Sequence, residues 1–276
     1  MRLLAVAILI AVVSSCSDSG TVESVESPQG TAFGIPRGIE PAAVDIATKI
    51  VAQRLDAAEV TGYRIDVADS ALWIAVPEDT PPIVLEMAVA DGVVSLRPVL
   101  EVLLESPFVS DPEGAIPDGV DPSTGLTIDD DTSSESYLQD ESKVVYHVGS
   151  AFVAGSDITG ASVDHSLNLW LVKPEFSESA AAAFLEATKA AATYPFDDPR
   201  RRIAVVVDGV VVSAPAMARE VDPTAGVDPA DMAITFGPED QDALRARVVA
   251  AYLSAGALPF RLTRPGDPAL EGATNS

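Results

Sequence analysis

Side chains that commonly carry enzyme or metal chemistry are sparse in this chain. The two histidines, His147 and His165, lie outside the H-x-x-x-H spacing that presents two imidazoles to zinc. Ser150 and Ser156 each follow a glycine, but neither stands in the G-x-S-x-G turn that exposes a nucleophilic serine. The sequence has no Walker loop and no G-x-G-x-x-G phosphate or dinucleotide motif. We therefore predict a protein that is not an enzyme, with no catalytic residue, metal site or cofactor; a catalytic triad assembled only in space stays open as an alternative.

Charge narrows the class of partner. The chain has 17 Lys and Arg against 42 Asp and Glu, a formal net charge of −25. A surface of this charge repels phosphate backbones, so we expect no nucleic-acid partner. The run 129–131 consists of three aspartates, but it lacks the alternating ligands, central glycine and closing glutamate of an EF-hand loop. We predict a solvated acidic loop there, and leave open whether the net charge serves solubility or attracts a basic partner.

The single cysteine, Cys16, follows a short apolar segment. Arg2 precedes an apolar run from Leu3 to Val13, which is too short to span a bilayer, and the small residues Ser14 and Ser15 come next. The sequence Val-Ser-Ser-Cys resembles the lipobox of bacterial lipoproteins. That resemblance implies that residues 1–16 are a signal peptide and that Cys16 is the lipid attachment site. We expect an extracytoplasmic protein that is lipid-anchored to the bacterial cell membrane; an ordinary secretory signal with a chance cysteine is the alternative.

Residues 17–37, rich in Ser, Gly, Glu and Pro, are expected to form a flexible tether. Helical spacing and strand alternation after the tether predict a small α+β layer with helices on one face of a sheet. Its expected elements are a helix over 41–58, strands over 63–67 and 71–76, a short helix over 82–88 and a strand over 93–104. Residues 106–142, with four prolines and an acidic run, are predicted to be a long exposed loop.

The second half of the chain is predicted to add strands and two long helices. The expected elements are a strand over 143–148, a hairpin over 158–173 that turns at 164–166, a helix capped by Ser177 and ending near 193, a strand over 233–236, a helix from 237 to Gly256, a strand over 257–262 and a loose tail over 263–276.

The strongest local signal is the segment from Arg202 to Pro215. Two β-branched runs, Ile203–Val207 and Val210–Val212, flank the dipeptide Asp208-Gly209. Asp-Gly favours a type I′ turn, which needs positive φ at both central residues. Both arms are apolar with little alternation, so we expect this hairpin in the middle of a sheet that is covered on both faces.

Three segments together resemble the large extracytoplasmic domain of SecD, a membrane subunit of the bacterial protein-export machinery. IAVVVDGVVVSAP (203–215) resembles the family's strand, Asp-Gly, strand and Ser-Ala-Pro segment. AGALPFRL (255–262) resembles the end of the helix before the family's later membrane spans. IVAQRLDAAEV (50–60) resembles an Arg-Val-Asp helix. The order and spacing of the segments agree with the family over about 41–262, apart from the acidic loop.

The resemblance implies a two-lobed α+β ectodomain with antiparallel or mixed sheets. Its base would comprise residues 38–105 and 238–262, and an inserted head subdomain would comprise 143–237. In the family the head is thought to swing and to hold emerging polypeptide. A proton relay needs ionisable residues inside membrane spans, and we expect none here. The expected function is that of a non-enzymatic lipoprotein that contacts exported polypeptides or translocon subunits; the alternative is a small-ligand-binding lipoprotein with a cleft between base and head.

Overall fold

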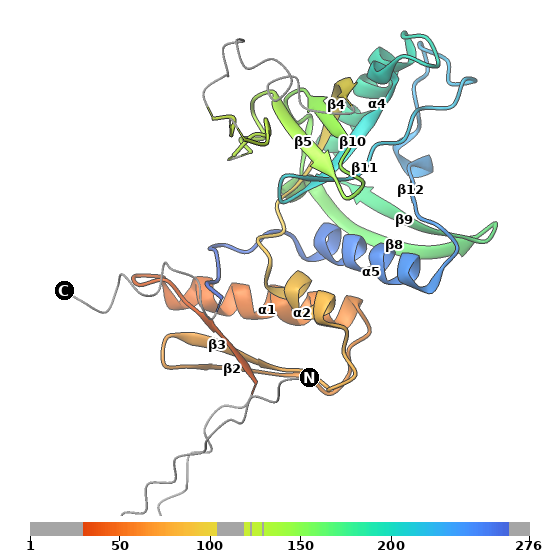
Figure 1. Ribbon diagram of the computed structural model, residues 1–276. Coiled ribbons are helices and arrows are strands. Elements are labelled where there is room, and N and C mark those ends of the chain that lie inside the picture. The colour runs from red at the N-terminus through yellow and green to blue at the C-terminus, as the bar shows by residue number, and fades with distance from the viewer. Residues whose placement is uncertain (1–29, 104–118, 122, 129, 265–276) are drawn as a thin grey trace, which may run out of the picture.

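The computed structural model describes residues 30–103, 119–121, 123–128 and 130–264. Two lobes lie on opposite sides of a long C-terminal helix, α5 (Asp240–Ala255), and Figure 1 shows α1 on one side of this helix and β8 and β9 on the other. The two-lobed α+β architecture that the sequence predicted is confirmed.

The first lobe is a three-stranded antiparallel sheet with two helices on one face (Figure 1). Its strand order is β1-β3-β2, so β3 is central. Proline at the first turn suits both helices because its fixed φ is already helical. The elements are β1 (Thr31–Gly34), α1 (Pro41–Ala57), β2 (Arg64–Ala68), β3 (Ala71–Ala75) and α2 (Pro82–Val89).

The second lobe is built around a closed ring of strands. Strands β10, β11, β5, β6 and β4 pair in that order, and β10 pairs again with β4. The long β4 also pairs with β7, and a separate sheet has the order β12-β9-β8. The elements are β4 (Val94–Leu103), β5 (Ser136–Asp140), β6 (Val145–Val148), β7 (Val153–Ala154), β8 (Ile158–Ser166), β9 (Leu169–Phe176), α4 (Glu178–Ala192), β10 (Ile203–Val207), β11 (Val210–Ser213) and β12 (Ile234–Thr235).

The central hairpin has the predicted turn and the predicted burial. Asp208 and Gly209 both have positive φ, 48° and 75°. Every residue of β10 is buried, and β10 lies between β11 and β4. Its alternate side chains enter two different cores: Val205 packs in the larger core, and Ala204 and Val206 pack in a smaller core inside the ring. The strand is therefore covered on both faces, as its apolar sequence indicates.

Helix α5 connects the two lobes through one continuous core. Its start has a capping box in which Glu239 and Asp242 bond each other's backbone N–H, and Gly256 ends it with a positive φ of 74°. Buried α5 residues such as Val249 and Leu253 belong to the same core as Leu55 of α1 and Val172 of β9. The lobes are therefore not separated by solvent along this helix.

Several segments differ from the sequence-based expectation. The tether predicted for 17–37 includes β1, which pairs with β3. The exposed loop predicted for 106–142 is wrong at β5, where Ser136 and Leu138 are buried. Strand β4, predicted within the base, pairs with β10 in the ring. Strands β1 and β5 are short, β4 contains Pro98, and each of the three pairs with a strand distant in sequence, which local propensity does not predict.

Two further predictions are wrong in detail. The β8–β9 hairpin turns at Leu167 and Asn168, both with positive φ, so His165 lies in a strand instead of the turn. The strand predicted over 257–262 is absent from the described structure of that segment, and the isolated bridge to Gly34 is formed by Thr263, just after it. Leu258 and Leu262 are nevertheless buried, so these apolar residues pack into the core without forming a strand.

Some predictions fall on residues outside the described ranges. These are the signal peptide, Cys16, most of the tether, residues 104–105 of the base, residues 106–118, 122 and 129 of the acidic loop, and the tail from 265 onward. Among the residues that the structure does describe, no helix has the length and hydropathy needed to cross a bilayer.

Candidate functional site: a groove beside α5 and two buried arginines

An apolar groove runs along α5 where the two lobes meet. It has a volume of about 470 Å³. One wall is formed by Leu244 and Val248 of α5, and the opposite wall by Val211 and Val212 of β11. Ile83 of α2, half exposed, closes the end next to the first lobe. The groove therefore takes residues from both lobes.

The rim of the groove is polar. Arg245 of α5 forms an ion pair with Glu141, which follows β5, and both side chains are largely exposed. Asp140 is already engaged, because its carboxylate accepts bonds from the Val144 N–H at 2.9 Å and the Tyr146 hydroxyl at 3.3 Å. An apolar floor with a polar rim is typical of sites that take mixed-polarity ligands.

A second apolar cavity, of about 310 Å³, lies within the second lobe. Phe184 and Thr188 of α4 and Val205 of β10 line one side, and the irregular segment 214–233 covers the other with Met217 and Met232. Methionine side chains adapt to ligands of varied shape, so this cavity also suits an apolar group.

Arg54 of α1 is fully buried next to the groove's closed end, where the lobes join. Its guanidinium donates to five backbone carbonyls. The acceptors belong to Met87, Ala88, Ala90, Asp91 and Gly256, at distances of 2.5 to 3.3 Å. Met87 and Ala88 lie in the last turn of α2, Ala90 and Asp91 follow it directly, and Gly256 ends α5, so the cation lies at the negative ends of two helix dipoles. Burial lowers the pKa of Arg54.

Tyr252 and Asp208 complete this junction. The Tyr252 ring lies against the Arg54 guanidinium, 4.9 Å from centroid to Cζ. Burial, followed by the nearby Asp208 charge, raises the pKa of the Tyr252 hydroxyl to about 12. The Asp208 carboxylate accepts from the N–H groups of Gly92 and Val93, at 3.0 and 2.7 Å. The turn of the central hairpin is thus bonded to the segment that connects the lobes.

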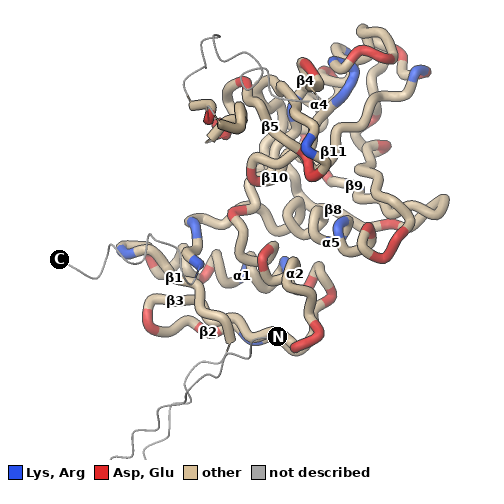
Figure 2. Tube along the Cα trace, in the orientation of Figure 1, with Lys and Arg blue, Asp and Glu red and all other residues tan. Residues whose placement is uncertain are grey.

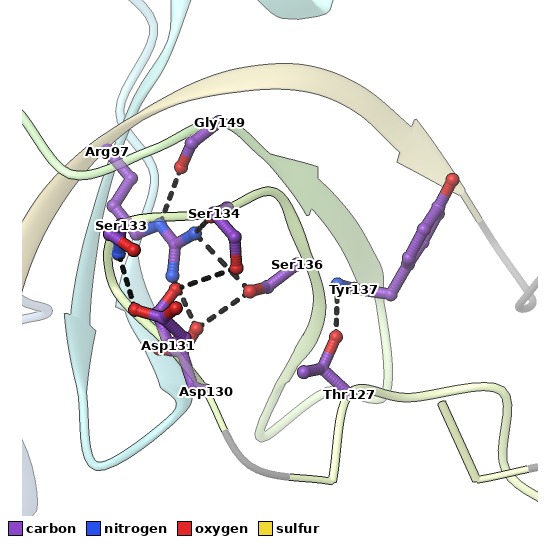
Figure 3. Close-up of polar contacts among 9 residues, drawn as sticks. All are labelled: Arg97, Thr127, Asp130, Asp131, Ser133, Ser134, Ser136, Tyr137 and Gly149. Carbon is purple, nitrogen blue, oxygen red and sulfur yellow. Dashed lines mark hydrogen bonds and ion pairs between the residues drawn. The ribbon is translucent and has the colours of Figure 1, made fainter. Parts of the chain in front are cut away.

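Arg97 of β4 is the second fully buried arginine, and it lies at the ring of strands (Figure 3). It is opposite Ala204 in the register, so it shares the inner face of the ring. It pairs with Asp130 at 2.5 Å, donates to the carbonyl of Gly149 at 2.6 Å and also bonds the carbonyl of Ser134. Ser136 donates to the same Asp130 oxygen at 2.8 Å.

This network corrects the prediction of a purely solvated acidic run. Asp130 is only 11% exposed and neutralises a buried cation. Its neighbour Asp131 behaves as predicted: it is solvated, and bonds from the Ser133 backbone lower the pKa of its carboxyl. One aspartate of the run therefore fixes the segment before β5 against the ring (Figure 3).

The other residues considered for chemistry are not brought together. His147 lies in β6, 2.9 Å from Glu135 and stacked on Tyr137. His165 lies in β8, in a different sheet, against Trp170. Ser213 ends β11 opposite Val205. Among the described residues, no group of three or more His, Cys, Asp or Glu is arranged to hold a metal.

The sequence reasoning missed both fully buried arginines, Arg54 and Arg97, and the groove. A signal existed for Arg54, which falls on the apolar stripe of its helix with Val51 and Leu55 on neighbouring positions. Arg97 stands in a strand otherwise read as apolar. The groove depends on how α5 meets β11, which local patterns do not specify.

Acidic side chains dominate the surface around these features. Figure 2 shows Asp and Glu over both lobes, with Lys and Arg fewer and scattered. Among the described residues, most ion pairs join side chains on the surface, and only the Arg97 pair is buried. Surface pairs of this kind contribute little to stability.

Comparison with known proteins identifies the second lobe. A family model for the SecDF P1 head subdomain matches residues 133–260. The match starts before and ends after the range 143–237 predicted for the head, and it includes β5 and α5. No curated protein matches the chain. The resemblance to a SecD or SecDF ectodomain that the sequence indicated is confirmed, and the chain carries a domain similar to the SecDF P1 head subdomain.

The chain shares its fold with a solved structure of SecDF. A crystal structure of SecDF in its super-membrane-facing form is 16% identical with a TM-score of 0.51, over 85% of this chain and 29% of that one. The chain thus spans less than a third of that SecDF. A second SecDF structure, described as a membrane component that enhances protein export, is 16% identical with a TM-score of 0.48, over 85% of this chain and 96% of that one.

Proposed function

We propose that this protein is a non-enzymatic, extracytoplasmic lipoprotein of protein export. It is anchored by lipid at Cys16, contacts exported polypeptides or translocon proteins through its SecD-like head, and has no proton-driven activity of its own. The observation that carries the proposal is the apolar groove within the region that matches the SecDF head. A proton relay needs ionisable residues inside membrane spans. The described residues include no helix that could span a membrane, and the proposal that the protein lacks proton-driven activity applies to those residues.

The groove has the properties that an unfolded segment needs. Its floor combines aliphatic residues of α5 and β11. Packing of another apolar side chain against them is favourable because it removes apolar surface from water. Ile83 and Leu244 are only partly buried, so their apolar side chains are accessible to a bound chain. The polar rim offers partners to the peptide backbone. A site of this kind favours apolar segments with little further sequence preference.

Binding of a permanently unfolded, carboxymethylated polypeptide, followed by fluorescence anisotropy, tests the proposal. Leu244→Glu places a charge in the groove and is expected to abolish saturable binding. The matched control is Ile46→Glu on α1, a half-exposed apolar residue that is not among the groove's lining residues. Circular dichroism confirms that both variants are folded. Absence of saturable binding to the wild type, or equal binding by both variants, contradicts the proposal.

The alternative function is binding of a small ligand at the boundary between the lobes. The observation in its favour is the groove volume, which falls in the range of about 300–1,000 Å³ typical of small-molecule sites. A thermal-shift screen of small envelope metabolites distinguishes the two functions. A saturable shift that Leu244→Glu removes, without any polypeptide binding, favours the small ligand.

A further inference from the structure

The chain passes between the lobes at two places, and the two passages are bonded to each other. One passage is the segment 90–93 after α2, and the other is the segment 256–258 after α5. The N–H of Leu258 donates to the carbonyl of Asp91 at 2.8 Å. Arg54 donates to both passages, to Asp91 at 3.2 Å and to Gly256 at 2.7 Å. A bend in either passage would break bonds in both.

The second lobe holds the first passage from the other side. Asp208 accepts from the N–H groups of Gly92 and Val93, and its own N–H donates to the carbonyl of Val93 at 2.9 Å. These three bonds join a turn of the second lobe to the passage. A hinge requires residues whose φ and ψ can change freely, and here the backbone groups of Gly92 and Val93 are engaged.

Gly92 is packed too closely to act as a flexible hinge. Its φ of +72° is one that residues with side chains rarely adopt. A Cβ atom added there would lie 1.8 Å from Nη2 of Arg54 and 3.1 Å from Cδ1 of Tyr252. The glycine is needed because the guanidinium occupies the space beside it.

The apolar core also resists separation of the lobes. Val249 and Leu253 of α5 are buried together with Leu55 of α1 and Val172 of β9. Rotation of one lobe against α5 would expose side chains of this shared core to water, which costs free energy in proportion to the apolar area exposed.

We infer that the two lobes form one rigid unit, locked at their junction by Arg54 and Asp208 around Gly92. The lock differs from the swinging head that the SecD resemblance implies. This consequence rests on the proposed function: if the groove binds polypeptide, the lock holds that polypeptide at a fixed position relative to the first lobe. The lock itself depends only on the junction.

Distances between two spin labels, measured by double electron–electron resonance, test the lock in the full chain. Spin labels at Ile46→Cys on α1 and Glu186→Cys on α4, in a Cys16→Ser background, report the separation of the lobes from two exposed helical positions. The wild-type junction is expected to give a single narrow distance distribution. A broad or two-peaked distribution overturns the inference, whatever the result of the polypeptide-binding assay.

Two junction variants and two matched controls locate the lock. Gly92→Ala displaces Arg54, and Asp208→Ala removes the acceptor for two N–H groups; both are expected to lose the narrow peak. Gly62→Ala has the same positive φ with nothing within 4 Å of the added Cβ, and Asp222→Ala removes an exposed carboxylate that bonds only its own turn. Both controls are expected to keep the peak.

The variants also separate the lock from the shared core. If Gly92→Ala does not fold, Asp208→Ala still tests the lock, because it leaves the space around Arg54 unchanged. A folded Asp208→Ala protein with the wild-type distribution overturns the assignment, since the core alone would then hold the lobes. Broadening in the two controls overturns it as well.

Discussion

Arg54 and Arg97 are both fully buried, but their positive charges are compensated in different ways. Arg54 donates to five carbonyl oxygens, and within the described structure none of its hydrogen-bond partners is a carboxylate. Arg97 has the carboxylate of Asp130 and two carbonyl oxygens. The first arginine depends on the positions of two helix ends, and the second on a single side chain from a segment outside the ring.

The difference shows how each lobe is held together. At the junction, carbonyl oxygens at the ends of α2 and α5 bind the cation directly, and the nearby charges of Asp208 and Asp91 also favour it, so the charge is best stabilised while both helices end at the same point. At the ring, the ion pair ties the segment before β5 to β4, and the rest of the lobe does not depend on it. We therefore expect damage at Arg54 to spread across both lobes and damage at Arg97 to stay local.

Removal of the Arg54 charge should give the largest effect. Arg54→Met leaves five buried carbonyls without their donor, and we expect the free energy of unfolding to fall by about 4 kcal/mol. Arg54→Lys should rescue little of this loss, because an ammonium cannot reproduce the planar fork of donors. Urea unfolding, followed in both lobes, measures the change.

Arg64→Met is the matched control for Arg54. The Arg64 side chain is 61% exposed and pairs with Asp66 at the surface, so its loss should change stability by no more than about 0.5 kcal/mol. Equal effects of the two substitutions would contradict the role given to the helix ends at Arg54.

Removal of the Arg97 counter-ion should give the next largest effect. Asp130→Ala leaves a buried guanidinium unpaired, at an expected cost of about 3 kcal/mol. Arg97→Met combined with Asp130→Ala should cost less than the sum of the two single changes, because the double variant has no uncompensated charge. Additive losses in a double-mutant cycle would show that the pair is not coupled.

An exposed pair gives the smallest effect and a distinct pH dependence. Bonds from the Arg200 side chain lower the pKa of Asp198 to about 2. Because the pKa is depressed in the folded protein, the carboxylate stabilises the fold above its unfolded value of about 3.9 and the contribution is lost as pH falls through about 2. Asp198→Asn should therefore be less stable than wild type at neutral pH, and the two should converge in strong acid. Parallel pH curves would refute this.

Local patterns predicted the elements whose signals are short-range. Asp208-Gly209 placed the hairpin turn, Ser177 placed the start of α4 by accepting from the Ala180 N–H at 3.2 Å, and Gly256 ended α5. Each signal depends on the backbone preferences of a few adjacent residues, and the folded protein keeps those local conformations.

Long-range pairing could not be predicted in the same way. Nothing local to Thr31 shows that it enters a sheet, because its partner strand β3 is distant in sequence. Strand β5 pairs with the nearby β6, but its other partner, β11, is also distant in sequence. The pairing of Arg97 with Asp130 has the same origin: an acidic run and a buried cation meet only once the ring closes. The groove, too, exists only where α5 passes β11.

Photo-crosslinking in living cells during active export tests the central claim most directly. A photoreactive amino acid in place of Leu244, in the groove, is expected to crosslink to polypeptides in transit or to translocon subunits. The same residue in place of Ile46, outside the groove's lining, is expected to give no such products. Absence of crosslinks at Leu244, or identical products at both positions, would contradict the claim that the groove contacts exported chains.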